Sequence, residues 1–364
     1  MGISFEKRRK IAMNMKNKIL EVPIIQGGMG VGVSLSKLAG SVAACGAMGT
    51  ISSVNAGYRE DDFLTNPVGA NLRALEKEIA KAKELSEGKG LIAVNIMTAV
   101  TNYEATCKCA VAAGADVIIS GAGLPLTLPQ YTKGTDTLCA PIVSSGRAAR
   151  LLMKHYKKNY DVYPDFFVIE GSRAGGHLGF SDEELEKGTA KSNQEILKEV
   201  KEVVGDIPVF VAGGVFDGKD MAELVELGAA GVQLATRFIA TEECDADVRF
   251  KQAIVDAKKE DILIIKSPVG MPARAINSPL IKRLAAGEKF LAKKCNNCLT
   301  ACKKNAEIPY CISRALIEAV KGNWEEGLFF TGSNADRVDK IMSVRELIAE
   351  IMDEFILFAT PRTK

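Results

Sequence analysis

Short apolar runs recur along the first two thirds of the chain. Each is almost continuous in apolar residues and rich in Val and Ile, and the runs occupy residues 22–29, 47–53, 90–97, 116–123, 140–145, 166–172, 207–215 and 231–238. A parallel strand covered by helices on both faces of its sheet is buried on both sides, so its sequence loses the alternation of polar and apolar positions. The pattern therefore predicts a series of buried parallel strands.

Amphipathic segments lie between most of these runs, for example at residues 34–46, 71–85, 193–205 and 217–228. The last two reach a glycine, which commonly ends a helix. Eight strand–helix units in roughly 240 residues match a (β/α)₈ TIM barrel, an α/β fold, in count and length. A doubly wound open sheet is the alternative, but its first strand is expected to lead into GxGxxG, and the sequence QGGMGVG has a different spacing.

Three regions follow from this pattern. Residues 1–20 form a basic leading segment, which we interpret as solvated, because six Lys and Arg residues there face a single acidic residue. Residues 21–265 form the predicted barrel. Residues 266–364 form a C-terminal extension that holds a cysteine cluster and two helical stretches, 310–322 and 340–355. We expect this extension to pack on the barrel rather than fold as a separate domain.

The composition narrows the functional classes. Hydrophobic residues make up 47% of the 364 residues, charged residues 25%, and the formal net charge is +2, so an electrostatic nucleic-acid binder is excluded. The longest apolar stretch, 91–100, is interrupted by Asn95 and Thr98 and is shorter than the roughly 20 residues of a membrane span. We expect a cytoplasmic protein without a signal peptide, with no nucleic-acid or membrane partner; homodimer formation is left open.

The carboxyl ends of the predicted strands carry the candidate chemistry, because a TIM barrel binds its ligands there. The strand ends hold Gly28 and Met29, Asn95, Ser120, the turn 173–177, Gly213 and Gly214, and Ala235 and Thr236. Glycine lets backbone N–H groups approach an anion closely. Gly213, Gly214 and Thr236, on consecutive strands, therefore indicate a phosphate site.

His177 is one of only two histidines and lies inside the glycine-rich stretch GSRAGGHLGF, residues 171–180. The residues alone leave three interpretations open: phosphate binding, catalysis, or a loop that happens to contain a histidine. Imidazole suits proton transfer because its pKa lies near working pH. The other histidine, His155, lies among lysines in a predicted helix and is interpreted as a surface residue.

Seven motifs in this order, VPIIQGGMG, VNIM, SGAG, EGSRAGGH, VAGGV, GVQLATRF and SPVGMPAR, resemble the nitronate monooxygenase (formerly 2-nitropropane dioxygenase) family. The flavin-dependent enoyl-ACP reductases belong to the same superfamily. The resemblance covers about residues 20–280. It implies a TIM barrel that binds FMN without covalent attachment and a small-molecule substrate.

The resemblance also implies roles for single residues. Gly28 and Met29 would lie against the flavin ring, and Asn95 would hydrogen-bond it. Ser120 and Ala235 would lie at the cofactor, and the ribityl phosphate would be held by Gly175, Gly176, Gly213, Gly214 and Thr236. His177 matches the family histidine that acts as a base or proton donor beside the flavin.

Arg173 departs from the family pattern, which has Glu at this position, EAGGH in place of RAGGH. The arginine would either pair with Glu170, bind an anionic substrate such as a nitronate or a phosphopantetheine thioester, or lie on the surface without a role. All three readings are open at this point.

The nine cysteines form two groups. Cys45, Cys107, Cys109, Cys139 and Cys244 are scattered and are interpreted as small hydrophobic residues. Cys295, Cys298, Cys302 and Cys311 instead follow C-x₂-C-x₃-C-x₈-C, a spacing that suits a metal. Four thiolates bind either a [4Fe–4S] cluster or zinc. Free thiols or a regulatory disulfide are the other readings.

Three functional hypotheses remain. The first is an FMN-dependent oxidoreductase that oxidises nitronates or nitroalkanes. The second is an enoyl-thioester reductase that takes its electrons from NAD(P)H through flavin, which the basic Arg173 favours. The third is a barrel that binds a phosphorylated ligand without catalysis.

Overall fold

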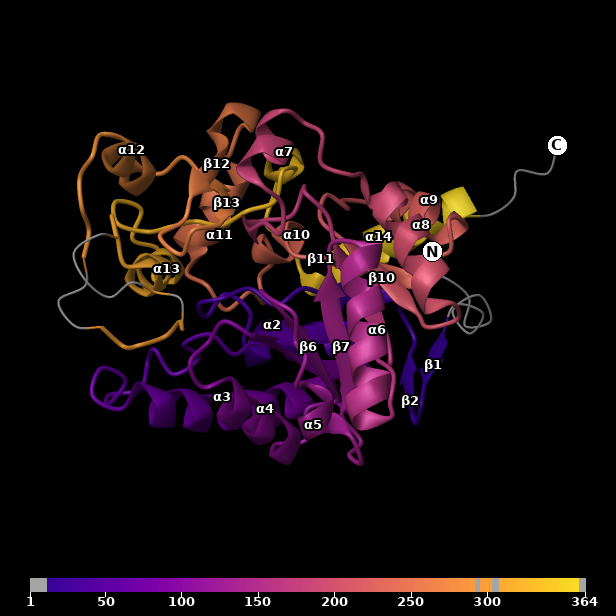
Figure 1. Ribbon diagram of the computed structural model, residues 1–364. Helices are drawn as coiled ribbons and strands as arrows, with labels where there is room; N and C mark the ends of the chain where they lie inside the picture. Colours follow the sequence, from indigo (N-terminus) through magenta and orange to yellow (C-terminus); the bar gives the residue numbers. More distant parts are fainter. Residues whose placement is uncertain (1–11, 292–294, 301, 303–307, 360–364) are drawn as a thin grey trace.

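The computed structural model describes residues 12–291, 295–300, 302 and 308–359, and its centre is a closed barrel of eight parallel strands (Figure 1). In barrel order the strands are β3 (Ile24–Gln26), β4 (Met48–Ser52), β5 (Leu91–Met97), β6 (Val117–Gly121), β7 (Leu138–Val143), β8 (Phe167–Glu170), β10 (Val209–Ala212) and β11 (Gly231–Leu234). β11 pairs with β3 and closes the barrel. The predicted TIM barrel is confirmed, and every predicted strand is present.

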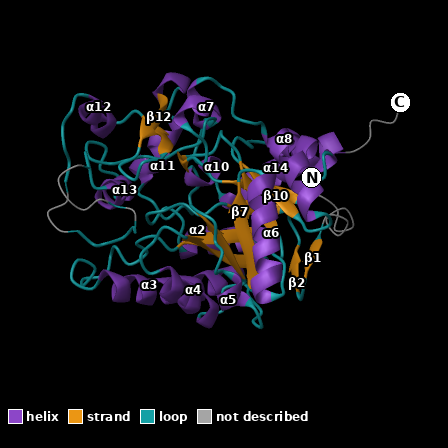
Figure 2. Ribbon diagram, viewed as in Figure 1, coloured by secondary structure: helices purple, strands orange, loops and turns teal. Residues whose placement is uncertain are grey.

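Helices follow the strands and surround the barrel (Figure 2). They are α2 (Ser36–Ala44), α3 (Pro67–Ser86), α4 (Tyr103–Ala112), α5 (Pro129–Thr132), α6 (Gly146–Tyr160), α8 (Asn193–Val204), α9 (Gly218–Glu226), α10 (Thr236–Ile239) and α11 (Val248–Val255). Local sequence fixes several starts. Ser192 and Glu195, for example, form a capping box at α8, which satisfies backbone N–H groups that the first turn leaves unpaired.

The last helix, α14 (Val344–Ala359), completes the ring of helices by packing against α9 and α2. The contact with α9 is close enough to require glycine, since a Cβ at Gly218 would lie 2.2 Å from the carbonyl oxygen of Ile351. The backbone N–H of Gly218 also donates to Glu354 Oε2 at 2.9 Å. The end of the predicted extension is therefore part of the barrel's outer layer, and it packs as closely as the helices encoded before residue 265.

A hairpin of β1 (Met13–Met15) and β2 (Lys18–Leu20) covers the amino-terminal end of the barrel. Met15 and Leu20 are buried in one cluster with Phe166 and Phe210 from the barrel interior. The expectation of a solvated leading segment is wrong for Met15 and Leu20, because a parallel barrel leaves an apolar opening at its lower end that this hairpin closes. Asn14, Lys16, Asn17 and Ile19 are exposed, as expected. Residues 1–11 lie outside the described part of the chain.

The rest of the extension, together with the segment after β8 and residues 259–265, covers the opposite end of the barrel. β12 (Ile262–Lys266), β13 (Pro272–Ile276) and β9 (Gly176–His177) form a three-stranded antiparallel sheet. Around it lie α7 (Asp182–Glu186), α12 (Pro279–Ala285), α13 (Ile312–Val320) and the short 3₁₀ helices η1 (Lys259–Asp261) and η2 (Ala335–Arg337). A separate apolar cluster that includes Leu280, Tyr310 and Leu328 holds this cover together.

The described residues include no helix that is long and apolar enough to cross a membrane.

The hairpin is a testable source of stability. Leu20 is fully buried, whereas Ile19 beside it is 57% exposed. Leu20→Ala is expected to lower the free energy of unfolding by about 2–5 kcal/mol, because it leaves a cavity under the barrel. Ile19→Ala, the matched control, is expected to change it by less than about 0.5 kcal/mol. Urea unfolding of both variants measures the difference, and equal effects would contradict the closing role of the hairpin.

Candidate functional site

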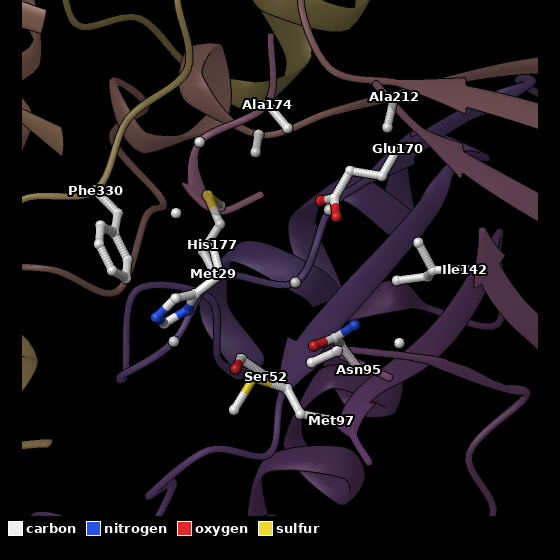
Figure 3. Close-up of a pocket in the computed structure, with 18 of the residues that line it drawn as sticks. Met29, Ser52, Asn95, Met97, Ile142, Glu170, Ala174, His177, Ala212 and Phe330 are labelled. Carbon is white, nitrogen blue, oxygen red and sulfur yellow. The ribbon is translucent and has the colours of Figure 1, made fainter. Parts of the chain in front are cut away.

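A cavity of about 530 Å³ lies between the carboxyl ends of the barrel strands and the cover formed by the extension. This volume is typical of a site for a small molecule or cofactor. Figure 3 shows its walls: Asn95, Met97, Ile142 and Glu170 project from barrel strands, and Phe330 approaches from the extension. The cavity is where the barrel architecture places a ligand.

The structure brings the predicted site residues together with a single exception. The cavity is lined by Gly28, Met29, Asn95, Gly175, Gly176, His177, Gly213, Gly214, Ala235 and Thr236. These residues come from five different strand ends, so the fold confirms that they share one location. Their individual roles at a cofactor stay predictions.

Ser120 is the exception, and the structure corrects its assignment to the cofactor site. Its side chain is fully buried, donates to the carbonyl of Ile96 at 2.7 Å and lies 2.9 Å from the hydroxyl of Tyr103 on α4. Neighbouring positions of a strand point to opposite faces. Ile119 faces the barrel interior, and Ser120 therefore faces the helices.

One corner of the cavity is built from glycine turns with unpaired donors. Gly213 and Gly214 have φ of +91° and +89°, a region that side chains rarely allow. Asn193 donates to the carbonyl of Gly213 at 2.8 Å, and Asn334 donates to the carbonyl of Gly214 at 3.2 Å. Among the described residues, none accepts a hydrogen bond from the backbone N–H of either glycine. Donors fixed in this way are suited to an anion.

A loop of the extension completes this corner. A Cβ at Gly175 would lie 2.5 Å from the carbonyl carbon of Thr331, so the two backbones are in close contact. Thr236 Oγ1 accepts a hydrogen bond from the N–H of Gly332 at 2.9 Å. The hydroxyl of Thr331 is buried and has no partner among the described residues. A buried polar group without a partner is costly, and because Thr331 lines the cavity we count its hydroxyl among the candidate ligand contacts.

His177 lies elsewhere on the cavity wall and is held by the extension. Its backbone pairs with Ala273 of β13, its Nε2 lies 2.8 Å from Ser267 Oγ, and its ring packs edge-on against Phe330. Burial lowers the pKa of His177 to about 4. The imidazole is therefore neutral at ordinary pH with its lone pair free, and the same burial makes it a weaker base than an exposed histidine, whose pKa lies near working pH.

Glu170, at the end of β8, is a cavity residue whose side chain the sequence did not identify as part of the site. Its carboxyl is the only one among the described residues that line the cavity, and burial raises its pKa to about 7. Figure 3 shows it projecting from the same side of the cavity as Ala212. This carboxyl changes charge near neutral pH, so it affects which ligands the cavity accepts.

Gly28, Met29 and Asn95 form another part of the cavity wall. A Cβ at Gly28 would lie 2.4 Å from Cβ of Asn95, so only glycine fits between the two strand ends. Asn95 Nδ2 donates to the carbonyl of Ile119 at 3.3 Å, which fixes the amide. Met29, labelled in Figure 3, lines the cavity and offers an apolar surface. Together with the anion corner, this wall fits a cofactor that has a planar ring and a phosphate.

The four clustered cysteines lie next to the cavity. Cys298 lines it, and burial, together with the nearby thiols of Cys311, Cys302 and Cys295, raises the pKa of Cys298 to about 11. In the described part of the chain, no group of three or more His, Cys, Asp or Glu side chains is arranged to hold a metal ion. The thiols are thus neighbours, and the predicted metal site stays a prediction.

Comparisons with known proteins agree on one family. The family described as "Nitronate monooxygenase" matches residues 13–354. A protein of Staphylococcus aureus strain Newman described as "Probable nitronate monooxygenase" is 27% identical over 291 residues, which cover 74% of this chain and 79% of that protein.

Solved structures show the same architecture. FabK from Thermotoga maritima has 26% sequence identity and a TM-score of 0.71, with 93% of this chain and 94% of that chain covered. The nitroalkane oxidase from Streptomyces ansochromogenes has a TM-score of 0.71 at 20% identity, with coverage of 93% and 96%, and supports the fold.

Proposed function

Because this chain belongs to the nitronate monooxygenase family and is an oxidoreductase, we propose that it uses FMN to oxidise nitronates and nitroalkanes. The proposal rests on one observation, a single cavity that joins an anion corner with unpaired N–H groups to a neutral, buried histidine. Because the family consists of oxidoreductases, we set aside the third hypothesis, a barrel that binds a ligand without catalysis.

The cavity fits FMN at both ends. Gly213, Gly214, Thr236 and the loop of Thr331 would hold the ribityl phosphate, since all of them line the cavity and the N–H groups of the two glycines have no acceptor among the described residues. Gly28, Met29 and Asn95 would lie against the isoalloxazine ring. When bound, FMN supplies the redox centre that takes electrons from the substrate carbon and passes them to O₂. The products of nitronate oxidation are then a carbonyl compound and nitrite.

His177 prepares neutral substrates for this reaction. A nitroalkane must lose the proton on its nitro-bearing carbon to become a nitronate, and the neutral imidazole is able to accept that proton. The contacts to Ser267 and Phe330 fix the ring in the cavity wall. A nitronate arrives already deprotonated and does not need this step.

The ionisation of Glu170 changes the charge of the cavity in which the substrate binds. Below about pH 7 the carboxyl is neutral and tolerates an anionic nitronate nearby. Above that pH it is ionised, and in a cavity shielded from water it repels the anion.

The second candidate is an enoyl-thioester reductase that uses NAD(P)H. Arg173 lines the cavity and has no acidic side chain within 4 Å in the described residues, which favours a substrate that carries phosphate on its acyl carrier. The choice between the two activities is a matter of substrate and electron donor, since both use the same flavin site.

Cys295, Cys298, Cys302 and Cys311 would bind a metal beside this site, as a [4Fe–4S] cluster or as zinc. The support is their sequence spacing and the closeness of the other three thiols to Cys298. A site at the cavity wall would place this metal near the flavin.

His177→Gln is expected to reduce kcat/KM for a neutral nitroalkane about 10²–10⁴-fold, the usual contribution of a general base. The same variant is expected to change kcat/KM for the matching nitronate by less than about 10-fold, since that substrate needs no proton removal. His155→Gln on α6 is the control and should leave both unchanged. Equal losses on both substrates, measured by oxygen consumption, would contradict the role as base.

The rate for nitronates should depend on pH through Glu170. With an anionic nitronate, kcat/KM is expected to fall as pH rises through about 7, because the carboxyl ionises. Glu170→Gln should remove this step. The control is the pH dependence of kcat/KM for a neutral nitroalkane, measured at pH values where this substrate stays protonated. The same fall of kcat/KM near pH 7 in wild type and in Glu170→Gln would refute the assignment.

Metal analysis of anaerobically purified protein tests the cysteine cluster. A cluster predicts about four iron and four sulfide per chain, and zinc predicts about one metal ion. Cys298→Ser should lose the metal, whereas Cys109→Ser, a change outside the cluster, should keep it. The prediction is contradicted if the purified protein contains neither iron nor zinc and all four cysteines of this segment react with an alkylating reagent.

A further inference from the structure

Two neighbouring arginines, Arg173 on the cavity wall and Arg274 behind it, have no acidic partner among the described residues. Arg173 is exposed and lines the cavity, and Arg274 of β13 is partly buried. Neither has a carboxylate within 4 Å among the residues that the structure describes. The pKa of Arg274 is lowered to about 10, mainly by burial and further by the positive charge of Arg173. A bound anion would lower the repulsion between these two positive charges.

The loop that carries Arg173 is fixed on both sides. Arg274 donates to the carbonyl of Ser172 at 2.9 Å and to the carbonyl of Ala174, the two neighbours of Arg173. Ser333 donates its backbone N–H to the carbonyl of Arg173 at 3.1 Å. Arg274 is therefore a positioning residue for this turn, and its side chain is occupied by backbone carbonyls.

The side chain of Arg173 lies over the glycine turn. A Cβ at Gly214 would lie 2.8 Å from Cβ and 3.1 Å from Nε of Arg173, and that Nε donates to Ser333 Oγ at 3.3 Å. No described residue accepts a hydrogen bond from the two terminal nitrogens of Arg173. The side chain of Arg173 thus lies against Gly214, and its two terminal nitrogens have no hydrogen-bond acceptor among the described residues.

Guanidinium donors and backbone N–H groups that converge on one point are the donor set of a phosphate site. From this arrangement we infer that Arg173 supplies the charge partner of a phosphate monoester at the Gly213–Gly214 corner. The inference rests on the proposed function, because that corner is part of the flavin cavity. The phosphate is the ribityl phosphate of FMN, as in the proposed function, or, if the phosphate of FMN lies elsewhere in the cavity, a phosphate on the carrier arm of a thioester substrate.

Flavin binding to the apoprotein separates these sources. If the phosphate belongs to FMN, Arg173→Gln weakens FMN binding about 10–100-fold, the value of a charge-assisted hydrogen bond, and changes riboflavin binding less than about 2-fold. Arg173→Lys restores part of the loss, since it keeps the charge without the fork of donors. Arg150→Gln, which removes an exposed charge on α6, serves as the matched control. Fluorescence quenching on titration measures all four proteins.

If the phosphate belongs to the substrate, FMN binding is unchanged in Arg173→Gln. The KM for a coenzyme A thioester then rises about 10–100-fold, while the KM for the same acyl group on N-acetylcysteamine, which has no phosphate, stays the same. A variant that binds FMN like wild type and shows the same KM ratio for the two thioesters overturns the inference.

If the proposed function is wrong, the flavin titrations give a different result from either case above. Wild-type protein would then bind neither FMN nor riboflavin. In that case inorganic phosphate is the probe: an increase of Tm with phosphate in wild type that is lost in Arg173→Gln supports the site, and equal increases in both overturn it.

Discussion

The antiparallel pairing of β9 with β13 is the contact on which the site depends. It joins the turn after β8, which carries Arg173 and His177, to a strand almost 100 residues later in the chain. Without it the barrel would still close, because its strands pair only with one another. Without this pairing His177 would no longer be held next to Ser267, and the cavity would lose one of its walls. The extension therefore converts an open barrel end into an enclosed site.

Enclosure also sets the electrostatics. Burial moves the pKa of His177 down to about 4 and the pKa of Glu170 up to about 7, so both groups favour their neutral forms. The effects on stability have opposite signs. The lowered pKa of His177 costs folding stability as pH falls below about 6.5, and the raised pKa of Glu170 costs stability as pH rises above about 4.5. The enclosed cavity thus holds a neutral imidazole and a carboxyl that ionises near pH 7, while Arg173 adds a positive charge on its wall.

The sequence predicted the barrel well because burial on both faces leaves a direct trace, the nearly continuous Val- and Ile-rich runs. It also predicted most of the site, since glycines and polar residues at strand ends must meet at one end of a parallel barrel. Ser120 was misplaced because a strand end does not reveal which of two adjacent side chains points inward. Leu20 was misread because the hairpin is short and its basic residues suggested solvent.

The sequence pattern did not reveal the site residues that come from the extension. Ser267, Phe330 and Thr331 lie in loops or strand ends where no periodicity distinguishes them, and they reach the site only through tertiary pairing. Glu170 was visible in the sequence, but only its burial in the cavity gives it an unusual pKa.

The central claim is that one flavin-binding cavity oxidises nitronates. The most direct measurement is the visible spectrum of the purified protein under anaerobic conditions, before and after addition of an alkyl nitronate. The account predicts flavin absorbance that bleaches on addition of the nitronate and returns when O₂ is admitted. A colourless protein that does not take up FMN, or a flavin that bleaches with NADH and ignores the nitronate, would contradict it.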